Sequence, residues 1–252
     1  TRRSVLSDMS SSKQVPQLRA ITGQERSTSL KARESWHIFG IISEFVEATE
    51  RLAEVRPAVS IFGSARVQPG HRWYELTVDL ARRLSDAGFA VISGGGPGIM
   101  EAANRGAFAG RSLSIGLNIQ LPREQSSNEF QDISLSYRHF FARKVAFAKY
   151  ATAFVAVPGG FGTLDELLEV LTLIQTRMGR LIPVLLIDSQ YWKGLLDWMR
   201  EQMLGNGLIS PEDMDLISVF DDPAQAVEAI FDFYQSRGFV PTADERESLL
   251  YL

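Results

Sequence analysis

The chain has 252 residues, of which 45% are hydrophobic and 22% are charged, a balance that fits one large globular domain with appendages. It contains no cysteine, which excludes disulfides, thiolate zinc sites and a cysteine nucleophile, and it contains no apolar run of 18 residues that could cross a membrane. The formal net charge of −4 argues against nucleic acid as a partner of the body of the protein, and we expect a cytoplasmic protein without a metal site.

Residues 1–29 are predicted to form a basic N-terminal tail. The first 33 residues hold seven Lys or Arg against two Asp or Glu, with many Ser and Thr and no apolar periodicity. Three interpretations stay open for this segment: an arm that binds an acidic partner, a targeting peptide, or a poorly ordered tail.

Residues 30–55 are predicted to form a helix that leads into the domain. Trp36, Phe39 and Ile42 recur at helical spacing, which places them on one face. A Rossmann-like domain is predicted to follow over residues 56–237, and a polar C-terminal tail over residues 238–252.

Strands and helices alternate throughout this domain. The predicted strands cover residues 58–62, 89–93, 112–117, 133–137, 153–157, 181–187 and 216–220. The predicted helices cover residues 73–87, 99–109, 139–150, 191–204 and 223–235, with one more after Thr163. Several strands are uniformly apolar, as in a sheet that is buried on both faces. The sequence therefore predicts an α/β fold: a Rossmann-like, doubly wound parallel sheet with helices on both faces and an N-terminal helical extension.

Two glycine-rich loops, residues 94–98 and 158–163, each follow a predicted strand and open a helix. Glycine lets the backbone approach a ligand closely, and the first turn of a helix offers N–H groups and positive potential to a phosphate. Ligands of such sheets bind beyond the carboxyl ends of the strands, where both loops lie. The alternative is that these glycines serve only tight turns.

Neither loop is a standard nucleotide motif. The first loop lacks the GxGxxG spacing and the acidic residue that binds the ribose in NAD-binding proteins, so NAD is disfavoured. Neither loop contains GxxxxGK[ST], so ATP or GTP hydrolysis is disfavoured as well. A small ligand such as a nucleoside monophosphate fits two such loops better than a triphosphate does.

Glu166 follows Thr163 by three residues, so it lies about one helical turn from the second loop. A carboxylate beside a phosphate site suggests chemistry on the adjoining sugar. Arg143 and Lys144 supply the opposite charge, and because arginine stays protonated, Arg143 can bind or position a substrate but cannot act as a general acid. The plainer alternatives are a helix-dipole interaction for the acids and a solvated helix position for Arg143.

Three segments carry a family resemblance. They are the string SGGGPGIM at residues 93–100, the Arg143-Lys144 pair and the string PGGFGTLDE at residues 158–166. Together they resemble the LOG ("Lonely Guy") family. These proteins are cytokinin riboside 5′-monophosphate phosphoribohydrolases that were once labelled lysine decarboxylases. The resemblance covers roughly residues 55–235, and its specific part, PGGxGTxxE, is complete here. It implies hydrolysis of a nucleoside 5′-monophosphate without a cofactor, with Arg143 and Glu166 as the catalytic residues.

The same resemblance implies a substrate-binding set around the two loops. That set comprises Ser64, Gly95, Gly96, Gly98, Met100, Lys144, Gly159, Gly160, Gly162 and Thr163. It also implies a homo-oligomer, a dimer or a hexamer, for which the apolar face of residues 36–45 is a candidate interface. Packing of that face on its own domain is the alternative.

The extensions of this chain leave the base open: AMP, a prenylated AMP, or another purine or pyrimidine monophosphate. A non-catalytic carrier of a phosphorylated ligand is a rival interpretation, because molybdenum-cofactor carrier proteins resemble this fold too. The intact Glu166 and Arg143 favour the enzyme. A DNA-processing protein of related fold is disfavoured by the acidic body.

Overall fold

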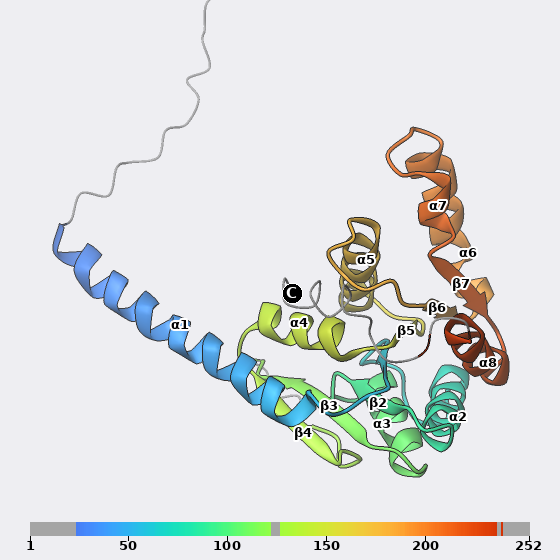
Figure 1. The fold of residues 1–252 in the computed structure, drawn as a ribbon, viewed down its shortest axis with the longest axis horizontal. Helices are drawn as coiled ribbons and strands as arrows, with labels where there is room; N and C mark the ends of the chain where they lie inside the picture. Colours follow the sequence, from blue (N-terminus) through green and yellow to red (C-terminus); the bar gives the residue numbers. More distant parts are fainter. Residues whose placement is uncertain (1–23, 122–126, 236–237, 239–252) are drawn as a thin grey trace, which may run out of the picture. The chain divides into compact units, whose positions relative to one another are not determined.

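The computed structural model describes residues 24–121, 127–235 and 238 (Figure 1). By its contacts the chain divides into two units, Thr1–Gly40 and Ile41–Leu252, and the division falls inside helix α1 (Gln24–Leu52). Of the predicted tails, 1–29 and 238–252, residues 1–23 and 239–252 lie outside the described residues, and residues 24–29 belong to α1. Helix α1 begins at Gln24, six residues before the predicted start.

A seven-stranded parallel sheet forms the centre of the second unit. The strands are β1 (Ala58–Phe62), β2 (Ala90–Ser93), β3 (Ser114–Ile119), β4 (Ile133–Tyr137), β5 (Ala153–Ala156), β6 (Val184–Ile187) and β7 (Ile217–Phe220). Their order is β4-β3-β2-β1-β5-β6-β7, and each neighbouring pair is parallel. The predicted α/β fold with a doubly wound parallel sheet is confirmed.

Helices cover both faces of this sheet (Figure 1). The remaining helices are α2 (Arg72–Asp86), α3 (Ile99–Phe108), α4 (Phe140–Tyr150), α5 (Phe161–Gln175), α6 (Ser189–Trp198), the π-helical turn Met199–Leu204, α7 (Pro211–Met214) and α8 (Pro223–Tyr234). One buried cluster joins the sheet to α4, α5, α6 and the end of α1, and the other joins it to α2, α3 and α8.

Strand β1 shows why both faces must be covered. All five of its residues are buried. Val59 and Ile61 belong to the cluster with α2, α3 and α8, whereas Ala58 and Phe62 belong to the opposite cluster. Apolar residues at every position, pointing alternately to the two faces, bury a strand completely.

The strand order reverses between β1 and β5, and this switch point locates the site. Strands β2 to β4 are added on one side of β1, and β5 to β7 on the other. In such sheets a crevice opens at the carboxyl ends of the two strands beside the switch. The loops that follow these strands meet there, because Ser64 N donates to Pro158 O at 3.2 Å.

Three local differences from the predicted elements have physical causes. Strand β6 begins at Val184 rather than at 181, directly after Pro183, which has no N–H for the ladder. Helix α6 begins two residues early because the Asp188 side chain accepts from Tyr191 N and caps it. Helix α5 already begins at Phe161, so the second glycine loop supplies its first turn.

None of the helices in the described part of the chain is long and apolar enough to span a membrane. The large side chains Trp36, Phe39 and Ile42 of α1 are exposed, whereas Ala48 and Leu52 near its end are buried. The prediction of a homo-oligomer stays a prediction.

Candidate active site

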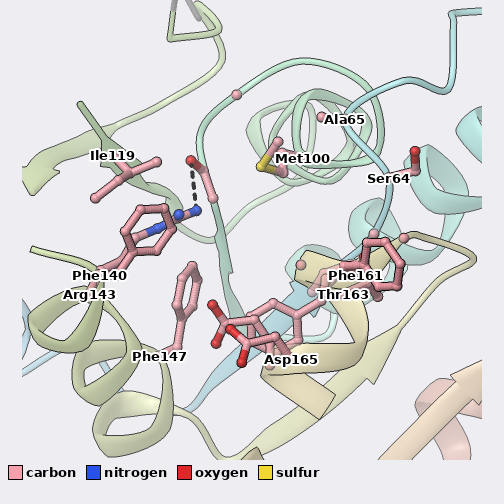
Figure 2. Close-up of a pocket in the computed structure, with 18 of the residues that line it drawn as sticks. Ser64, Ala65, Met100, Ile119, Phe140, Arg143, Phe147, Phe161, Thr163 and Asp165 are labelled. Atoms are coloured by element: carbon pink, nitrogen blue, oxygen red, sulfur yellow. Dashed lines mark hydrogen bonds between the residues drawn. The ribbon is translucent and has the colours of Figure 1, made fainter. Parts of the chain in front are cut away.

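A cavity of about 670 Å³ lies beyond the carboxyl ends of β1, β2, β3 and β5, with one wall formed by α4 (Figure 2). Ligand pockets of proteins have volumes in this range. The residues that line it are Ile61, Phe62, Gly63, Ser64, Ala65, Arg66, Gly94, Gly96, Met100, Asn118, Ile119, Leu121, Ser127, Phe140, Arg143, Phe147, Gly160, Phe161, Gly162, Thr163, Leu164, Asp165 and Glu166.

Most of the predicted site residues meet in this cavity. Its lining includes Arg143, Glu166, Ser64, Gly96, Met100, Gly160, Gly162 and Thr163. The other four predicted residues lie just behind the lining, where they contact residues that form it or neighbour it. They are Gly95, Gly98, Gly159 and Lys144.

The second glycine loop presents the open first turn of α5 to the cavity. Gly160 is the N-cap, and Phe161, Gly162 and Thr163 form the first turn, whose N–H groups have no partners inside the helix. A Cβ added at Gly160 or Gly162 would meet nothing within 4 Å. This turn therefore combines free donors, positive helix potential and open space, which are the requirements for binding a phosphate.

The first glycine loop is held from behind by amide side chains. The carbonyl of Gly95 accepts from Asn128 N at 2.8 Å, Asn128 Nδ2 at 2.9 Å and Gln131 Nε2 at 2.9 Å. The fully buried Asn104 in turn accepts from Asn128 Nδ2 through its Oδ1. These bonds turn the Gly95 carbonyl away from the cavity, while Gly94 and Gly96 line it.

Gly98 joins this loop to α3 in a backbone conformation that few other residues adopt. Its φ is 71°, and an added Cβ would lie 2.5 Å from Ser64 O and 2.7 Å from the backbone carbon of Ala65. Backbone atoms cannot move aside cheaply, so only glycine fits between the loops after β1 and β2.

We therefore expect Gly98→Ala to lower the free energy of unfolding by about 1–3 kcal/mol, measured by urea denaturation at 25 °C. Gly194→Ala is the matched control, because Gly194 lies in α6 with nothing within 4 Å of an added Cβ. That control should be neutral or stabilising, by up to about 1 kcal/mol. If the two variants were equally stable, the backbone strain predicted for an alanine at position 98 would be contradicted.

Arg143 extends from α4 into the cavity with unused hydrogen-bonding capacity. Its Nη2 makes one long contact, 3.5 Å, to Gly94 O, shown as a dashed line in Figure 2. Its buried Nε has no hydrogen-bond partner among the described residues, and its Cζ lies 5.2 Å from the ring centre of Phe147. A half-buried guanidinium with an unsatisfied Nε is suited to an anionic or hydroxyl-rich ligand.

Glu166 lies on the facing helix, one turn into α5, and lines the same cavity. Burial raises the pKa of its carboxyl from 4.5 to about 7, against the lowering effect of Arg143 and Lys144; the charges of Glu169 and Asp165 add to the rise. Burial also lowers the pKa of Arg143, which Glu166 partly opposes. A carboxyl in a cavity that titrates near neutral pH is typical of catalytic acids and bases.

Lys144 pairs with two acids of α5 beside the cavity. Its Nζ lies 3.1 Å from Asp165 Oδ1 and 2.9 Å from Glu169 Oε2. These pairs occupy the ammonium group and connect α4 to the first turns of α5. The structure thus places Lys144 next to the neighbours of Glu166, outside the cavity lining.

Several lining residues were missed by the sequence analysis. Asn118 was missed because the third strand was predicted to end at residue 117, whereas β3 runs to Ile119. Phe140 and Phe147 stand three residues before and four residues after Arg143 on α4. That spacing puts all three on one helix face, a signal that was present in the sequence.

The cavity does not fit a pyridoxal-dependent decarboxylase. Such an enzyme needs a lysine for the Schiff base, and no lysine lines the cavity in the part of the chain that the structure describes. Nor do the described residues hold any group of three or more His, Asp or Glu side chains placed to bind a metal ion.

Comparison with protein families gives one matching family model, described as "Possible lysine decarboxylase", over residues 100–230. Among curated proteins, the probable cytokinin riboside 5′-monophosphate phosphoribohydrolase LOGL5 of Oryza sativa subsp. japonica is 33% identical over 137 residues. That match covers 53% of this chain but only 55% of the rice protein. Cytokinin riboside 5′-monophosphate phosphoribohydrolase LOG1 of Arabidopsis thaliana is 30% identical over 161 residues, 63% of this chain and 73% of the relative.

Two solved structures share the fold at lower identity. The molybdenum cofactor carrier protein of Chlamydomonas reinhardtii has a TM-score of 0.54 at 21% identity, over 71% of this chain and 99% of that chain. The molybdenum cofactor binding protein of Rippkaea orientalis has a TM-score of 0.52 at 21% identity, over 70% of this chain and 96% of that chain. Likeness at this identity concerns the fold alone.

Proposed function

This chain belongs to the LOG family, and from that premise we propose that it hydrolyses the N-glycosidic bond of a nucleoside 5′-monophosphate. The products are the free base and ribose 5-phosphate, and the proposed substrate is AMP or an N6-modified AMP. One observation carries the proposal: Glu166, with its pKa raised to about 7, and Arg143 line one cavity with the open first turn of α5.

The α5 turn holds the 5′-phosphate in this proposal. Gly160 and Gly162 leave space for its oxygens, and the N–H groups of the first turn donate to them. Thr163 and Glu166 are one turn apart and both line the cavity. A phosphate bound at the turn therefore brings the attached ribose alongside the Glu166 carboxylate.

Bond cleavage then follows from the charges at the site. The bond between C1′ and the base nitrogen breaks with its electron pair going to the base, so C1′ gains oxocarbenium character. The Glu166 carboxylate stabilises that positive charge and orients the water whose oxygen bonds to C1′. The water's proton is transferred to the departing base, which balances the reaction. Arg143 stays charged and positions the substrate.

The base lies against an apolar wall in this arrangement. Phe140 and Phe147 of α4, with Ile119 and Leu121 at the end of β3, line that part of the cavity (Figure 2 labels the first three). Flat aromatic surfaces suit a purine ring, and aliphatic neighbours suit an apolar N6 substituent. These contacts support adenine and its N6-modified derivatives as the leaving base.

The test is incubation of the full chain with a panel of purine and pyrimidine nucleoside 5′-monophosphates, with the free base followed by chromatography. Release of adenine from AMP, or of the modified base from an N6-modified AMP, is the expected result. The matching unphosphorylated nucleosides should be poor substrates because they lack the group that α5 holds. Binding without release from any monophosphate would favour a carrier of a phosphorylated ligand instead.

Lys144 offers a test of how the charges around Glu166 set the pH dependence. If the ionised carboxylate is the active form, kcat/KM rises with pH with a midpoint near the Glu166 pKa of about 7. Lys144 lowers that pKa, while Asp165 and Glu169 raise it. Lys144→Ala removes the cation that lowers this pKa and leaves the charges of both acids in place, so the midpoint moves to higher pH.

We therefore expect Lys144→Ala to lose activity at pH 6 and to approach the parent enzyme at pH 9, while Lys144→Arg keeps the parent midpoint. The readout is the full pH profile of kcat/KM with one substrate, so that titration of the substrate phosphate is common to all variants. A uniform loss at every pH would assign Lys144 a purely structural role.

A further inference from the structure

The orientation of the peptide that joins Gly159 to Gly160 is critical for the phosphate-binding turn of α5. The two glycines themselves constrain this orientation little. Its carbonyl belongs to Gly159 and its N–H to Gly160, and in a planar trans peptide these two groups point in opposite directions. With glycine on both sides, no Cβ opposes rotation of this peptide unit. A rotated peptide would present a carbonyl oxygen, not an N–H, to a bound phosphate.

The structure holds this peptide in one orientation through Tyr191. The Tyr191 hydroxyl donates to Gly159 O at 2.5 Å, across 32 residues of sequence. Gly160 lines the cavity, whereas Gly159 and Tyr191 do not. The carbonyl thus points away from the cavity to α6, and the N–H of Gly160 must point to the opposite side.

Tyr191 is itself fixed by a polar cluster at the end of β6. Asp188, which is 7% exposed, accepts from Tyr191 N at 3.0 Å through Oδ1. Its Oδ2 accepts from Arg72 Nη2 and from Trp73 Nε1, each at 2.6 Å. The Tyr191 ring meets Trp73 edge to face, with 5.4 Å between ring centres. A ring restrained at both its backbone and its face keeps its hydroxyl in one place.

We infer that Tyr191 is a positioning residue that locks the Gly159–Gly160 peptide with its N–H toward the phosphate of the ligand. This inference rests on the proposed function for the identity of the ligand. Tyr191 acts through the loop without touching the substrate, so its contribution is to phosphate binding. Because phosphate is held equally in the ground state and the transition state, the loss should appear in KM and leave kcat unchanged.

The test is Tyr191→Phe, which deletes the hydroxyl and keeps the ring on Trp73. Tyr191 is 40% exposed, so the variant should fold, as thermal unfolding will check. Isothermal titration measures the affinity for ribose 5-phosphate and for free adenine, and kinetics measure KM and kcat for AMP. The matched control is Tyr74→Phe, which removes a hydroxyl bond of 2.7 Å to Glu101 in another part of the fold.

We expect Tyr191→Phe to weaken ribose 5-phosphate binding and to raise KM by roughly 3- to 10-fold, the usual net worth of one neutral hydrogen bond. Adenine affinity and kcat should stay at parent values, and Tyr74→Phe should change none of these quantities. Unchanged affinity for ribose 5-phosphate would overturn the inference, as would an equal loss for adenine. If the parent protein releases no base yet its ribose 5-phosphate affinity still depends on Tyr191, the proposed function fails and the inference stands.

Discussion

Glu166→Gln should reduce kcat for nucleotide hydrolysis by about 10³-fold while leaving the affinity for ribose 5-phosphate nearly unchanged. Glutamine has the same shape but carries no charge, so it can neither stabilise an oxocarbenium-like C1′ nor orient the attacking water as a carboxylate does. The phosphate turn of α5 is untouched by the change. Single-turnover kinetics and titration calorimetry at pH 8 measure the two quantities separately.

The same substitution should stabilise the fold at alkaline pH. Burial raises the Glu166 pKa from 4.5 to about 7, so the folded state resists ionisation of this group. Below pH 4.5 the carboxyl is protonated in both states and costs nothing; as pH rises through 7 the full ionisation penalty develops. A shift of this size corresponds to an upper limit of roughly 3 kcal/mol, and we expect Glu166→Gln to gain about 1–3 kcal/mol at pH 8.

Urea denaturation of parent and variant at pH 5 and pH 8 tests this sign, because most of the gain should vanish at the lower pH. Glu169→Gln is the control: Glu169 lies three residues further along α5 and pairs with Lys144 outside the cavity lining. At pH 8 it should keep kcat within about threefold of the parent. If Glu166→Gln is inactive but no more stable at pH 8 than the parent, the raised pKa of Glu166 is refuted. If Glu166→Gln is active, the catalytic role of Glu166 is refuted.

Local signals in the sequence were sufficient to predict most of the fold. The apolar run at residues 58–62 matches β1, which is buried on both faces. The alternating apolar and polar residues 133–137 match the edge strand β4, in which Leu135 and Tyr137 are buried and the serines are exposed. The positions of glycine loops behind strands predicted where the ligand site lies. The short helix α7 was missed, although Pro211 and the capping box of Ser210 and Asp213 mark its start in the sequence. Residues 199–204 were predicted as the end of a helix, and the structure makes them a π-helical turn, which carries no clear local signal.

The site was predictable where one segment supplied the chemistry, and less so where distant segments meet. Residues 158–166 form a continuous strand-loop-helix unit, so their roles could be predicted together. The bonds from Asn128 to the first glycine loop and from Tyr191 to Gly159 join residues more than 30 positions apart. Neither spacing has a periodicity that a single sequence reveals. Lys144 adjoins Arg143 in sequence, yet successive helix residues point in different directions, and Lys144 reaches Asp165 and Glu169 instead of the cavity.

Arg143→Ala should lower kcat/KM for the nucleotide by about 10²–10³-fold, because the guanidinium lines the proposed substrate cavity and its charge acts on Glu166. Its removal also raises the Glu166 pKa, so the acid limb of the pH profile should move to higher pH. Arg143→Lys should recover little, since a lysine ammonium lacks the planar fork and the stacking on Phe147 that the 5.2 Å contact provides. Added guanidinium ion should restore part of the activity of the alanine variant and none of that of Glu166→Gln.

A double-mutant cycle decides whether the two residues act on one transition state. If Arg143 holds the sugar in the position where Glu166 stabilises the charge at C1′, the second substitution has little left to remove. The double variant Arg143→Ala/Glu166→Gln should then lose about as much kcat/KM as Glu166→Gln alone. Fully additive losses would mean that Arg143 contributes binding energy independent of the carboxylate. Parent-level kcat/KM in Arg143→Ala would remove this residue from the site altogether.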